Sequence, residues 1–312
     1  MPFSPAAPRP TTRLRELLAA DGPVVMPGCY DALSARMIER AGFPAAAISG
    51  FAIETALLGG PDIGLMTLTE LTDQARRITG AVDIPVITDV DTGFGGVNNI
   101  FRTVRSLEQA GIAGFHLEDQ VTPKRCPVLP GRTLVPVEEA VGRYTAALEA
   151  RTDPDFMIIA RTDGDAVSYD EQITRANRYL EAGVDAVLPM IMEHDGAGVG
   201  TLPSDRQMEI ILRTVKDVDG PVMYVGDPPP GYRTADLAQA GVKILSQSAV
   251  TLNAAANAMH EVLAELAETG ESSGFDARRP RHVEAGRSLM DVMRVDHYLD
   301  FELRHTPERK AL

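Results

Sequence analysis

Residues 85 to 95 read Pro85-Val86-Ile87-Thr88-Asp89-Val90-Asp91-Thr92-Gly93-Phe94-Gly95, a short β-branched run that ends directly in two carboxylates. A second apolar run, residues 112–117, likewise ends in Glu118. A carboxylate at the end of a buried strand loses costly hydration unless a cation meets it. Asp89, Asp91 and Glu118 together therefore predict a bound Mg²⁺ or Mn²⁺ ion, because these metals prefer oxygen ligands. The alternative is that each carboxylate caps a helix or pairs with an arginine.

The same unit recurs on both sides of this stretch: an amphipathic helix that closes on Ala-Gly, followed by an apolar strand. The Ala-Gly pair stands at residues 41–42, 110–111, 182–183 and 240–241. Glycine suits the left-handed residue that ends a helix. The pattern predicts eight strands, at residues 24–27, 45–49, 85–89, 112–118, 156–161, 185–189, 221–225 and 243–247.

Most of these strands are almost continuously apolar, which indicates burial on both faces, as in a parallel sheet covered by helices. Eight strands that alternate with helices are typical of a (β/α)8 TIM barrel, and a doubly wound open α/β sheet is the alternative. We expect a flexible leader at residues 1–13, the barrel at 14–252 and additional C-terminal helices at 253–312.

Two helices are predicted in the C-terminal part, at residues 254–268 and 283–303, with a polar segment at 269–281 between them. Helices beyond a completed barrel must bury their apolar stripe elsewhere, and a neighbouring subunit could cover it.

Composition narrows the class of function. The 312 residues carry a formal net charge of -14 and show no concentrated basic face, which argues against nucleic acid or an anionic membrane as partner. No apolar run of about 18 residues predicts a membrane span. Two cysteines are too few for a disulfide framework. We therefore expect a cytoplasmic protein with a small-molecule carboxylic acid substrate.

Further polar residues stand where the predicted strands end, the edge at which TIM barrels carry their chemistry. They are Ser49 and Gly50 after the second strand, Asp62 in the Gly-rich loop 58–64, and Arg161 at the end of the fifth strand. The Arg161 guanidinium could bind a substrate carboxylate through two hydrogen bonds. The alternative is a structural ion pair with Glu118 or Asp163.

The basic, proline-containing loop at residues 122–132 could lie above the site as a lid. There Lys124 and Arg125 would attract an anionic substrate and lower the pKa of Cys126, as a proton-transferring thiol needs. The alternative for Cys126 is a packing role as a small hydrophobe, which we assign to Cys29.

The six histidines are scattered and predict no ligand set. His116 lies in the middle of a strand, whereas His194 could reach the site from the loop after the sixth strand. Tyr224, near the end of the seventh strand, and Tyr232 in the following loop could each wall the pocket or donate a hydrogen bond.

Taken together, these motifs resemble the isocitrate lyase and phosphoenolpyruvate mutase superfamily from about residue 14 to residue 300. They are Ser49-Gly50, residues 60–64, residues 89–95, residues 116–120, Lys124-Arg125-Cys126 and residues 160–163. The short members of the 2-methylisocitrate lyase, 2,3-dimethylmalate lyase and carboxyphosphoenolpyruvate mutase types are the most similar. The resemblance implies a barrel whose last helix is swapped with a neighbour, in a homotetramer or homodimer, and a Mg²⁺ ion that holds a 2-oxo or 2-hydroxy carboxylate.

For the metal, the resemblance implies that Asp89 is the direct ligand and that Asp91 and Glu118 act through water. Asp62 would sit close to the reacting centre. In lyases of this group the cysteine after Lys-Arg protonates the carbanion left by carbon–carbon cleavage, which points to Cys126. The mutase branch usually lacks this cysteine.

For the substrate, the resemblance implies that Ser49, Gly50 and Arg161 bind the pyruvate-like end. The chain departs from the family pattern at Phe51, which replaces a glycine, and at Pro127-Val128, which replace Gly-His. Met190 and Met192 stand where an acidic residue is usual, and Tyr224 and its neighbours stand where Asn is usual. These changes remove polar contacts to the distal carboxylates of a tricarboxylate. Each polar group left unpaired costs about 1 to 3 kcal/mol.

We therefore expect a Mg²⁺-dependent carbon–carbon lyase, or the reverse condensation, on a 2-hydroxy di- or tricarboxylate of the alkylmalate or methylisocitrate type. Pyruvate or a related 2-oxo acid would be one product, and the replacements favour a substrate with more alkyl surface. One alternative is a 2-oxo acid decarboxylase, for example of oxaloacetate, or a carbon–phosphorus mutase or hydrolase, on the same metal site. A non-catalytic metabolite-binding barrel is a third hypothesis.

Overall fold

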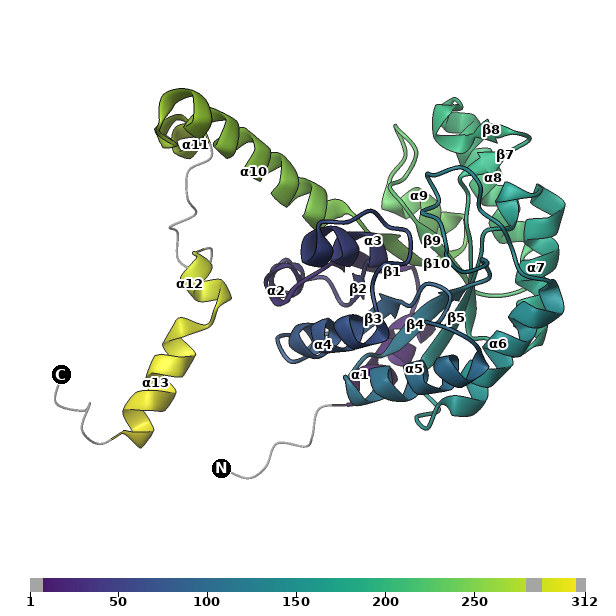
Figure 1. The fold of residues 1–312 in the computed structure, drawn as a ribbon, viewed down its shortest axis with the longest axis horizontal. Helices are drawn as coiled ribbons and strands as arrows, with labels where there is room; N and C mark the ends of the chain where they lie inside the picture. Colours follow the sequence, from purple (N-terminus) through teal and green to yellow (C-terminus); the bar gives the residue numbers. More distant parts are fainter. Residues whose placement is uncertain (1–7, 279–287, 307–312) are drawn as a thin grey trace. The chain divides into compact units, whose positions relative to one another are not determined.

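The computed structural model describes residues 8–278 and 288–306. The chain divides into two compact units, Met1–Leu252 and Asn253–Leu312. The first unit is a barrel of strands and helices, and the second consists of helices (Figure 1).

Eight parallel strands close into a barrel in the order β1-β10-β9-β6-β5-β4-β3-β2 (Figure 1). They are β1 (Val24–Cys29), β2 (Ala46–Ile48), β3 (Val86–Asp89), β4 (Gly114–Glu118), β5 (Met157–Thr162), β6 (Ala186–Pro189), β9 (Val222–Val225) and β10 (Val242–Gln247). All eight predicted strands, and the TIM barrel, are confirmed. Because β1 pairs with both β10 and β2, the sheet is closed and the open-sheet alternative is excluded.

Helices surround the strands on the outside of the barrel (Figure 1). They are α1 (Pro10–Ala19), α2 (Ala32–Arg40), α3 (Gly50–Ile53), α4 (Leu68–Thr79), α5 (Val97–Gln109), α6 (Val137–Ala150), α7 (Tyr169–Glu181), α8 (Ser204–Asp217) and α9 (Thr234–Gln239). A π-helical turn, Glu54–Leu58, continues α3, and short 3-10 turns lie at Gly164–Ala166 and Val199–Thr201. The loop after β6 forms a small hairpin of β7 (Glu193–His194) and β8 (Ala197–Gly198).

The first helix begins earlier than the sequence indicated. Helix α1 starts at Pro10, inside the segment expected to be a leader, because proline suits the first helical position. Leu14 of this helix is fully buried in the cluster of side chains that fills the barrel. Residues 1–7 of the expected leader lie outside the described residues.

Successive side chains of each strand alternate between the barrel interior and the layer under the helices. Ile87 and Ile159 belong to the inner cluster, whereas Val86 and Ile158 belong to the outer one. This alternation decides which residue at each strand end faces the centre of the barrel. The ladders also align Asp89 of β3 with His116 of β4, and Glu118 of β4 with Arg161 of β5.

The C-terminal helices are α10 (Val250–Thr269), α11 (Ser273–Arg278), α12 (Leu289–Val292) and α13 (Val295–His305). The predicted polar connection at 269–281 therefore contains a short helix. The predicted single helix at 283–303 is wrong over its described part, because the chain turns at Arg294, whose φ is 55°. Its first residues, 283–287, lie outside the described part of the chain. None of the helices within 8–278 and 288–306 has the length and apolar character of a membrane span.

Candidate active site

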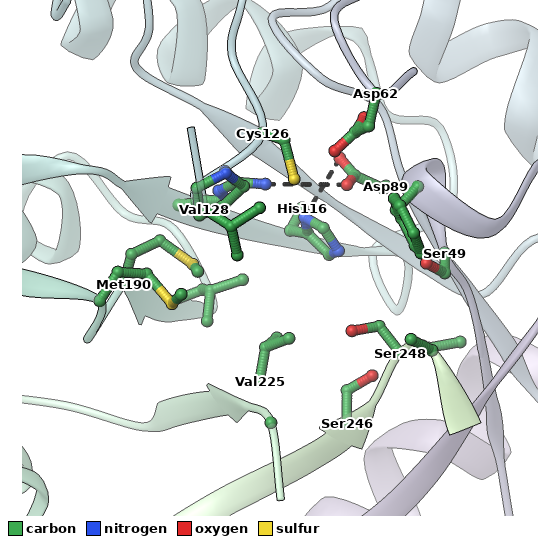
Figure 2. Close-up of a pocket in the computed structure, with 18 of the residues that line it drawn as sticks. Ser49, Asp62, Asp89, His116, Cys126, Val128, Met190, Val225, Ser246 and Ser248 are labelled. Carbon is green, nitrogen blue, oxygen red and sulfur yellow. Dashed lines mark ion pairs between the residues drawn. The ribbon is translucent and has the colours of Figure 1, made fainter. Parts of the chain in front are cut away.

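A cavity of about 320 Å³ lies at the carboxyl ends of the barrel strands, the size of a small-molecule site (Figure 2). It brings together seven of the residues predicted from the sequence: Ser49, Phe51, Asp62, Asp89, Cys126, Arg161 and Met190. Figure 2 shows Asp62, Asp89 and Cys126 on one side of the cavity and Val225, Ser246 and Ser248 on the other.

Asp89, the last residue of β3, faces two groups that neighbouring strands supply. Its Oδ1 lies 3.4 Å from Nδ1 of His116, and its Oδ2 lies 3.7 Å from Nη1 of Arg161. Burial lowers the pKa of His116, so the imidazole is neutral at pH 7. Burial also opposes ionisation of Asp89, but the nearby positive groups hold its pKa below the usual value, and Arg161 is the cation that faces it.

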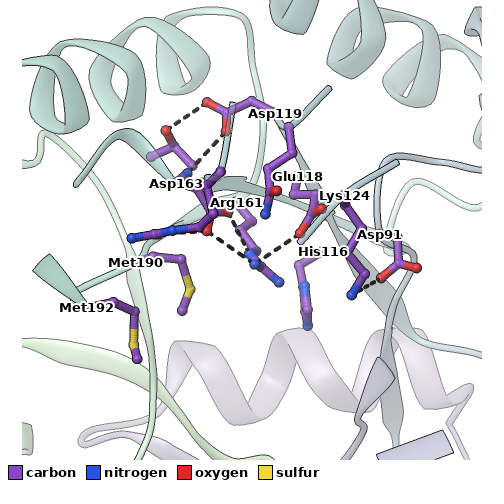
Figure 3. Close-up of polar contacts among 12 residues, drawn as sticks. Asp91, His116, Glu118, Asp119, Lys124, Arg161, Asp163, Met190 and Met192 are labelled. Carbon is purple, nitrogen blue, oxygen red and sulfur yellow. Dashed lines mark hydrogen bonds and ion pairs between the residues drawn. The ribbon is translucent and has the colours of Figure 1, made fainter. Parts of the chain in front are cut away.

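Arg161 is buried and binds two further carboxylates (Figure 3). Its Nη2 lies 3.0 Å from Glu118 Oε2, and its Nε lies 3.0 Å from Asp163 Oδ2. Burial raises the pKa of Glu118 well above its usual value, although Arg161 works against this rise. The structural ion pairs that were the alternative for Arg161 are therefore present, and the side chain also lines the cavity. Binding of a substrate carboxylate by Arg161 stays a prediction.

Lys124 is buried, and its ammonium group lies between Asp62 and Asp91. Its Nζ is 2.9 Å from Asp91 Oδ1 (Figure 3). Burial raises the pKa of Asp91 to about 7, and the charges of Asp89 and Asp62 add to the rise while Lys124 opposes it. Lys124 thus neutralises the carboxylates of the site and does not line the cavity, where the sequence had placed it as a substrate-binding residue.

Cys126 lines the cavity, but the expected activation of its thiol is wrong. Burial raises the pKa of Cys126 to about 11, and the neighbouring Asp62 carboxylate contributes to the rise. The ammonium group of Lys124 lies against Asp62 and Asp91, so it lowers the pKa of Cys126 only weakly. The backbone N–H of Cys126 donates to the carbonyl oxygen of Asp62 at 3.1 Å, which ties the loop to the site.

Arg125 does not take its predicted role of attracting an anionic substrate into the cavity. Its side chain is exposed and does not line the cavity, while its backbone exchanges two hydrogen bonds with the side chain of Gln120. Cys29, by contrast, is fully buried in the outer cluster, which confirms its packing role.

Ser49 and Gly50 begin helix α3 beside Asp89. The Ser49 hydroxyl accepts a hydrogen bond from the Ala52 N–H at 3.2 Å and so caps the helix. A Cβ atom on Gly50 would lie 2.9 Å from Asp89 Oδ2. A side chain at this position would therefore displace the Asp89 carboxylate, because the backbone passes directly against it.

The side of the cavity formed by the last strands is apolar with two hydroxyls. The apolar residues of this side are Leu188, Met190, Met192 and Val225, and the hydroxyls are those of Ser246 and Ser248, while the loop after β4 adds the apolar side chains of Pro127 and Val128. Among the residues that line the cavity, Arg161 is the only lysine or arginine. This side offers few partners for a second or third carboxylate.

Tyr224 was predicted to contact the substrate but points away from the cavity. It belongs to the outer layer, where it packs with the cluster that contains Leu245, and its hydroxyl donates to the carbonyl oxygen of Asp227 at 3.3 Å. Its neighbour Val225 lines the cavity instead. Strand alternation is the reason, since adjacent residues face opposite sides.

Ion pairs outside the cavity wall connect the loops around the cavity. Arg132 binds Asp163 at 2.9 Å and Asp165 at 2.7 Å, and it also reaches Glu193 at 2.9 Å. Asp165 in turn accepts the backbone N–H of Met192 at 2.8 Å. The loop after β4 and the loop after β6 are thereby joined through one buried cluster.

The site carboxylates fit a Mg²⁺ ion by their chemistry. Among the described residues, no three His, Cys, Asp or Glu side chains are arranged as a ligand set. Mg²⁺ does not require this, because it usually takes one or two carboxylates directly and keeps several waters. Asp89 faces the cavity, and neither oxygen of buried Glu118 has a hydrogen-bond partner, although Oε2 forms the ion pair with Arg161. Asp91 lines a neighbouring cavity.

Some residues that line the cavity were not predicted from the sequence as site residues. His116 could have been found, because it stands two residues before Glu118 and strand alternation turns both the same way. Ser246 and Ser248 could also have been found, because they stand at the carboxyl end of the last strand, β10. His194 is buried against the ring of Tyr169 and does not line the cavity.

Sequence comparison relates this chain to known enzymes. The family model for phosphoenolpyruvate phosphomutase matches residues 14–267. The 2,3-dimethylmalate lyase of Eubacterium barkeri is 37% identical over 263 residues, which cover 84% of this chain and 88% of that protein.

Solved structures agree with the barrel. The phosphoenolpyruvate phosphomutase from Streptomyces platensis subsp. rosaceus matches with a TM-score of 0.82 and 32% identity, over 95% of this chain and 99% of that one. A phosphonopyruvate hydrolase in complex with oxalate and Mg²⁺ matches with a TM-score of 0.81 and 28% identity, over 95% and 99% of the two chains.

Proposed function

The chain belongs to the phosphoenolpyruvate phosphomutase family, within the isocitrate lyase and phosphoenolpyruvate mutase superfamily, and from this premise we propose that it is a Mg²⁺-dependent carbon–carbon lyase. Its substrate is a 2-hydroxy di- or tricarboxylate of the alkylmalate or methylisocitrate type, and pyruvate or a related 2-oxo acid is one product. The observation that carries the proposal is the cavity itself, which combines Asp89, Arg161 and the Cys126 thiol with an apolar wall.

In this proposal Asp89 holds the metal directly, and Asp91 and Glu118 hold it through water. The ion would stabilise negative charge on the oxygens of the 2-hydroxy acid. Nη1 of Arg161 faces Asp89 at 3.7 Å, whereas Nε and Nη2 are engaged with Asp163 and Glu118. The Nη1 side of the guanidinium is therefore the part that can bind a substrate carboxylate.

The thiol of Cys126 acts as a proton donor. When the bond between C2 and C3 breaks, the C2 hydroxyl loses its proton to water and C2 becomes the carbonyl carbon of the 2-oxo acid. The electron pair of the broken bond stays on C3 of the departing acid, which must gain a proton. A general acid must carry its proton at the working pH, and the raised pKa of Cys126, about 11, keeps the thiol protonated near pH 7. The elevated pKa thus suits proton donation better than nucleophilic attack.

The wall of Met190, Met192 and Val225 favours alkyl groups over the distal carboxylates of a tricarboxylate. Burial of each methylene group is worth about 0.8 kcal/mol. The substrate is therefore expected to have more alkyl surface or fewer carboxylates than methylisocitrate.

An oxo-acid decarboxylase, or a carbon–phosphorus mutase or hydrolase, is the alternative on the same metal site. The likeness to phosphonopyruvate hydrolase and to phosphoenolpyruvate phosphomutase favours this alternative. Cys126 in the cavity counts against the mutase, because migration of a phosphoryl group within one molecule leaves no carbanion to protonate. A decarboxylase or a hydrolase also leaves an enolate that must gain a proton, so the thiol is compatible with either of these and the product analysis separates them from the lyase.

We also propose that the protein is a homotetramer or homodimer. Within the C-terminal unit, large apolar side chains of α10 and α13 are exposed: Met259, Leu263, Leu266, Tyr298, Leu299 and Phe301. A second copy of the chain would bury them. Light scattering coupled to size-exclusion chromatography should give two or four times the mass of one chain, and a monomer would refute this assignment.

The function is tested by mass-spectrometric product analysis. The protein is incubated with 2,3-dimethylmalate, other alkylmalates, methylisocitrate, oxaloacetate and phosphonopyruvate, each with Mg²⁺ and with EDTA. Mg²⁺-dependent release of pyruvate and a second acid from an alkylmalate supports the lyase. Carbon dioxide and pyruvate from oxaloacetate alone would support the decarboxylase, and no product from any compound would contradict both.

A further inference from the structure

Glu54 is a fully buried carboxylate that no part of the proposed mechanism uses. It follows α3 and begins the π-helical turn Glu54–Leu58. Among the described residues it has no ion pair and does not line the catalytic cavity. Its two oxygens instead accept backbone N–H groups of a loop, from Ile63 at 3.1 Å to Oε2 and from Met66 at 3.0 Å to Oε1.

The loop that Glu54 holds, residues 59–66, carries Asp62. Ile63, whose N–H binds Glu54, is the next residue after Asp62. The Asp62 carboxylate contacts the Lys124 ammonium, and its carbonyl oxygen accepts the N–H of Cys126 at 3.1 Å. A continuous chain of contacts therefore runs from Glu54 through Asp62 to the thiol.

The loop depends on this anchor. Gly59 and Gly64 have φ values of 62° and 79°, so the segment turns sharply at both residues. Glycine adopts many backbone conformations, so these turns alone do not hold the loop in one position. If the loop moved away, the Glu54 carboxylate would remain buried without its two donors, which is strongly unfavourable. Glu54 thus penalises those positions of the loop in which Ile63 and Met66 no longer donate to its carboxylate.

We propose that Glu54 is a positioning residue that fixes loop 59–66 and thereby holds Asp62 against Lys124 and Cys126. It acts through Asp62 and touches no substrate. The inference rests on the proposed function only in that Asp62 and Cys126 belong to the reaction centre; the anchoring itself can be measured without any substrate.

The first test is the alkylation of Cys126 in Glu54→Gln. The amide replaces one carboxylate oxygen by an NH₂ group, which faces a backbone N–H and cannot accept its hydrogen bond. With one bond lost, Asp62 should leave the thiol more often. We expect iodoacetamide to modify Cys126 about tenfold faster than in the unaltered protein, the equivalent of one buried hydrogen bond. Peptide mass spectrometry separates Cys126 from Cys29.

The matched control is Glu108→Gln. Glu108 also accepts two backbone N–H groups through its carboxylate, from Thr152 at 2.7 Å and Asp153 at 2.9 Å, but in the loop before β5, at the opposite end of the barrel. In Glu108→Gln the rate at which iodoacetamide alkylates Cys126 should stay within about twofold of the rate in the unaltered protein, well below the effect of one lost hydrogen bond. The proposal is overturned if Glu54→Gln and Glu108→Gln give the same rate, or if Cys29 becomes as reactive as Cys126, because the whole barrel has then loosened.

Hydrogen exchange of the unaltered protein gives a second test that needs no variant. The amide protons of Ile63 and Met66 should exchange as slowly as those of neighbouring helix α4, and faster exchange at the level of an exposed loop would overturn the proposal. Where turnover is measurable, Glu54→Gln should lower kcat about tenfold with little change in KM. Failure of the lyase assignment would leave no turnover to measure, yet the alkylation and exchange results would still decide the role of Glu54.

Discussion

Arg161 and Glu118 are direct partners in the ladder between β5 and β4, and their side chains form a buried ion pair with 3.0 Å between Nη2 and Oε2. The pair stands between the catalytic cavity, which Arg161 lines, and the outer charged shell, which begins at Asp163. The same guanidinium therefore serves both the stability of the barrel and the charge of the site.

Replacement of Arg161 by Met should destabilise the protein strongly. Glu118 would remain buried without its ion-pair partner, whereas Asp163 would keep Arg132, and breaking such a buried pair costs about 3 to 5 kcal/mol. Urea denaturation followed by circular dichroism measures the loss. Arg178→Met is the control, since the exposed ion pair of Arg178 with Glu138 should contribute at most about 1 kcal/mol. Equal losses in both variants would contradict the stabilising role of Arg161.

Cys126→Ser should lower kcat/KM for the cleaved alkylmalate by about a hundredfold or more, because a positioned proton donor contributes on this order. Cys29→Ala changes the other cysteine, in the outer core, and should retain turnover while lowering stability. Steady-state kinetics of pyruvate release compares them. Full activity of Cys126→Ser would show that the thiol does not donate the proton.

The reactivity of Cys126 should follow its raised pKa. Because the thiolate is the nucleophile and the pKa is about 11, alkylation of the metal-free protein should be slow at pH 7 and rise about tenfold per pH unit up to the limit of stability. Asp62→Asn removes one cause of the shift and should speed alkylation at pH 8. A rate that levels off near pH 9 would mean that the pKa is not raised.

Asp89→Asn should abolish Mg²⁺-dependent turnover, because Asp89 is the proposed direct ligand. Titration calorimetry with Mg²⁺ gives a readout that is independent of activity, and the binding heat should disappear. The control is Asp153→Asn, at a carboxylate that binds Thr11 near the start of the chain. Undiminished Mg²⁺ binding by Asp89→Asn would place the metal elsewhere.

Met192→Lys adds a cation to the apolar wall and should shift preference toward substrates with a distal carboxylate. The ratio of kcat/KM for methylisocitrate to that for 2,3-dimethylmalate should rise about tenfold, as for a modest gain of one charged hydrogen bond. Val167→Lys adds the same charge at an exposed residue that does not line the cavity, and it should leave the ratio unchanged. An unaltered ratio in Met192→Lys would mean that Met192 does not face the distal group.

The sequence alone determined the architecture and the edge of the barrel that carries the site. Strand runs such as residues 85–89 and the repeated Ala-Gly helix ends are local patterns, and a parallel barrel necessarily collects the carboxyl ends of its strands at one edge. Asp89, Arg161 and Cys126 could therefore be assigned to one site without any knowledge of their contacts.

Only the tertiary structure decided which charges meet and which side chains face the cavity. Lys124 pairs with Asp62, 62 residues away, while burial of Cys126 beside Asp62 raises the pKa of the thiol, opposite to the expected effect. Tyr224 points outward and Val225 lines the cavity, because the packing of helices on the barrel decides which of two adjacent strand residues faces its interior. Glu54 acquires its role through a loop that folds back over it. The strength and sign of an electrostatic effect depend on distance and burial, which packing between distant segments sets.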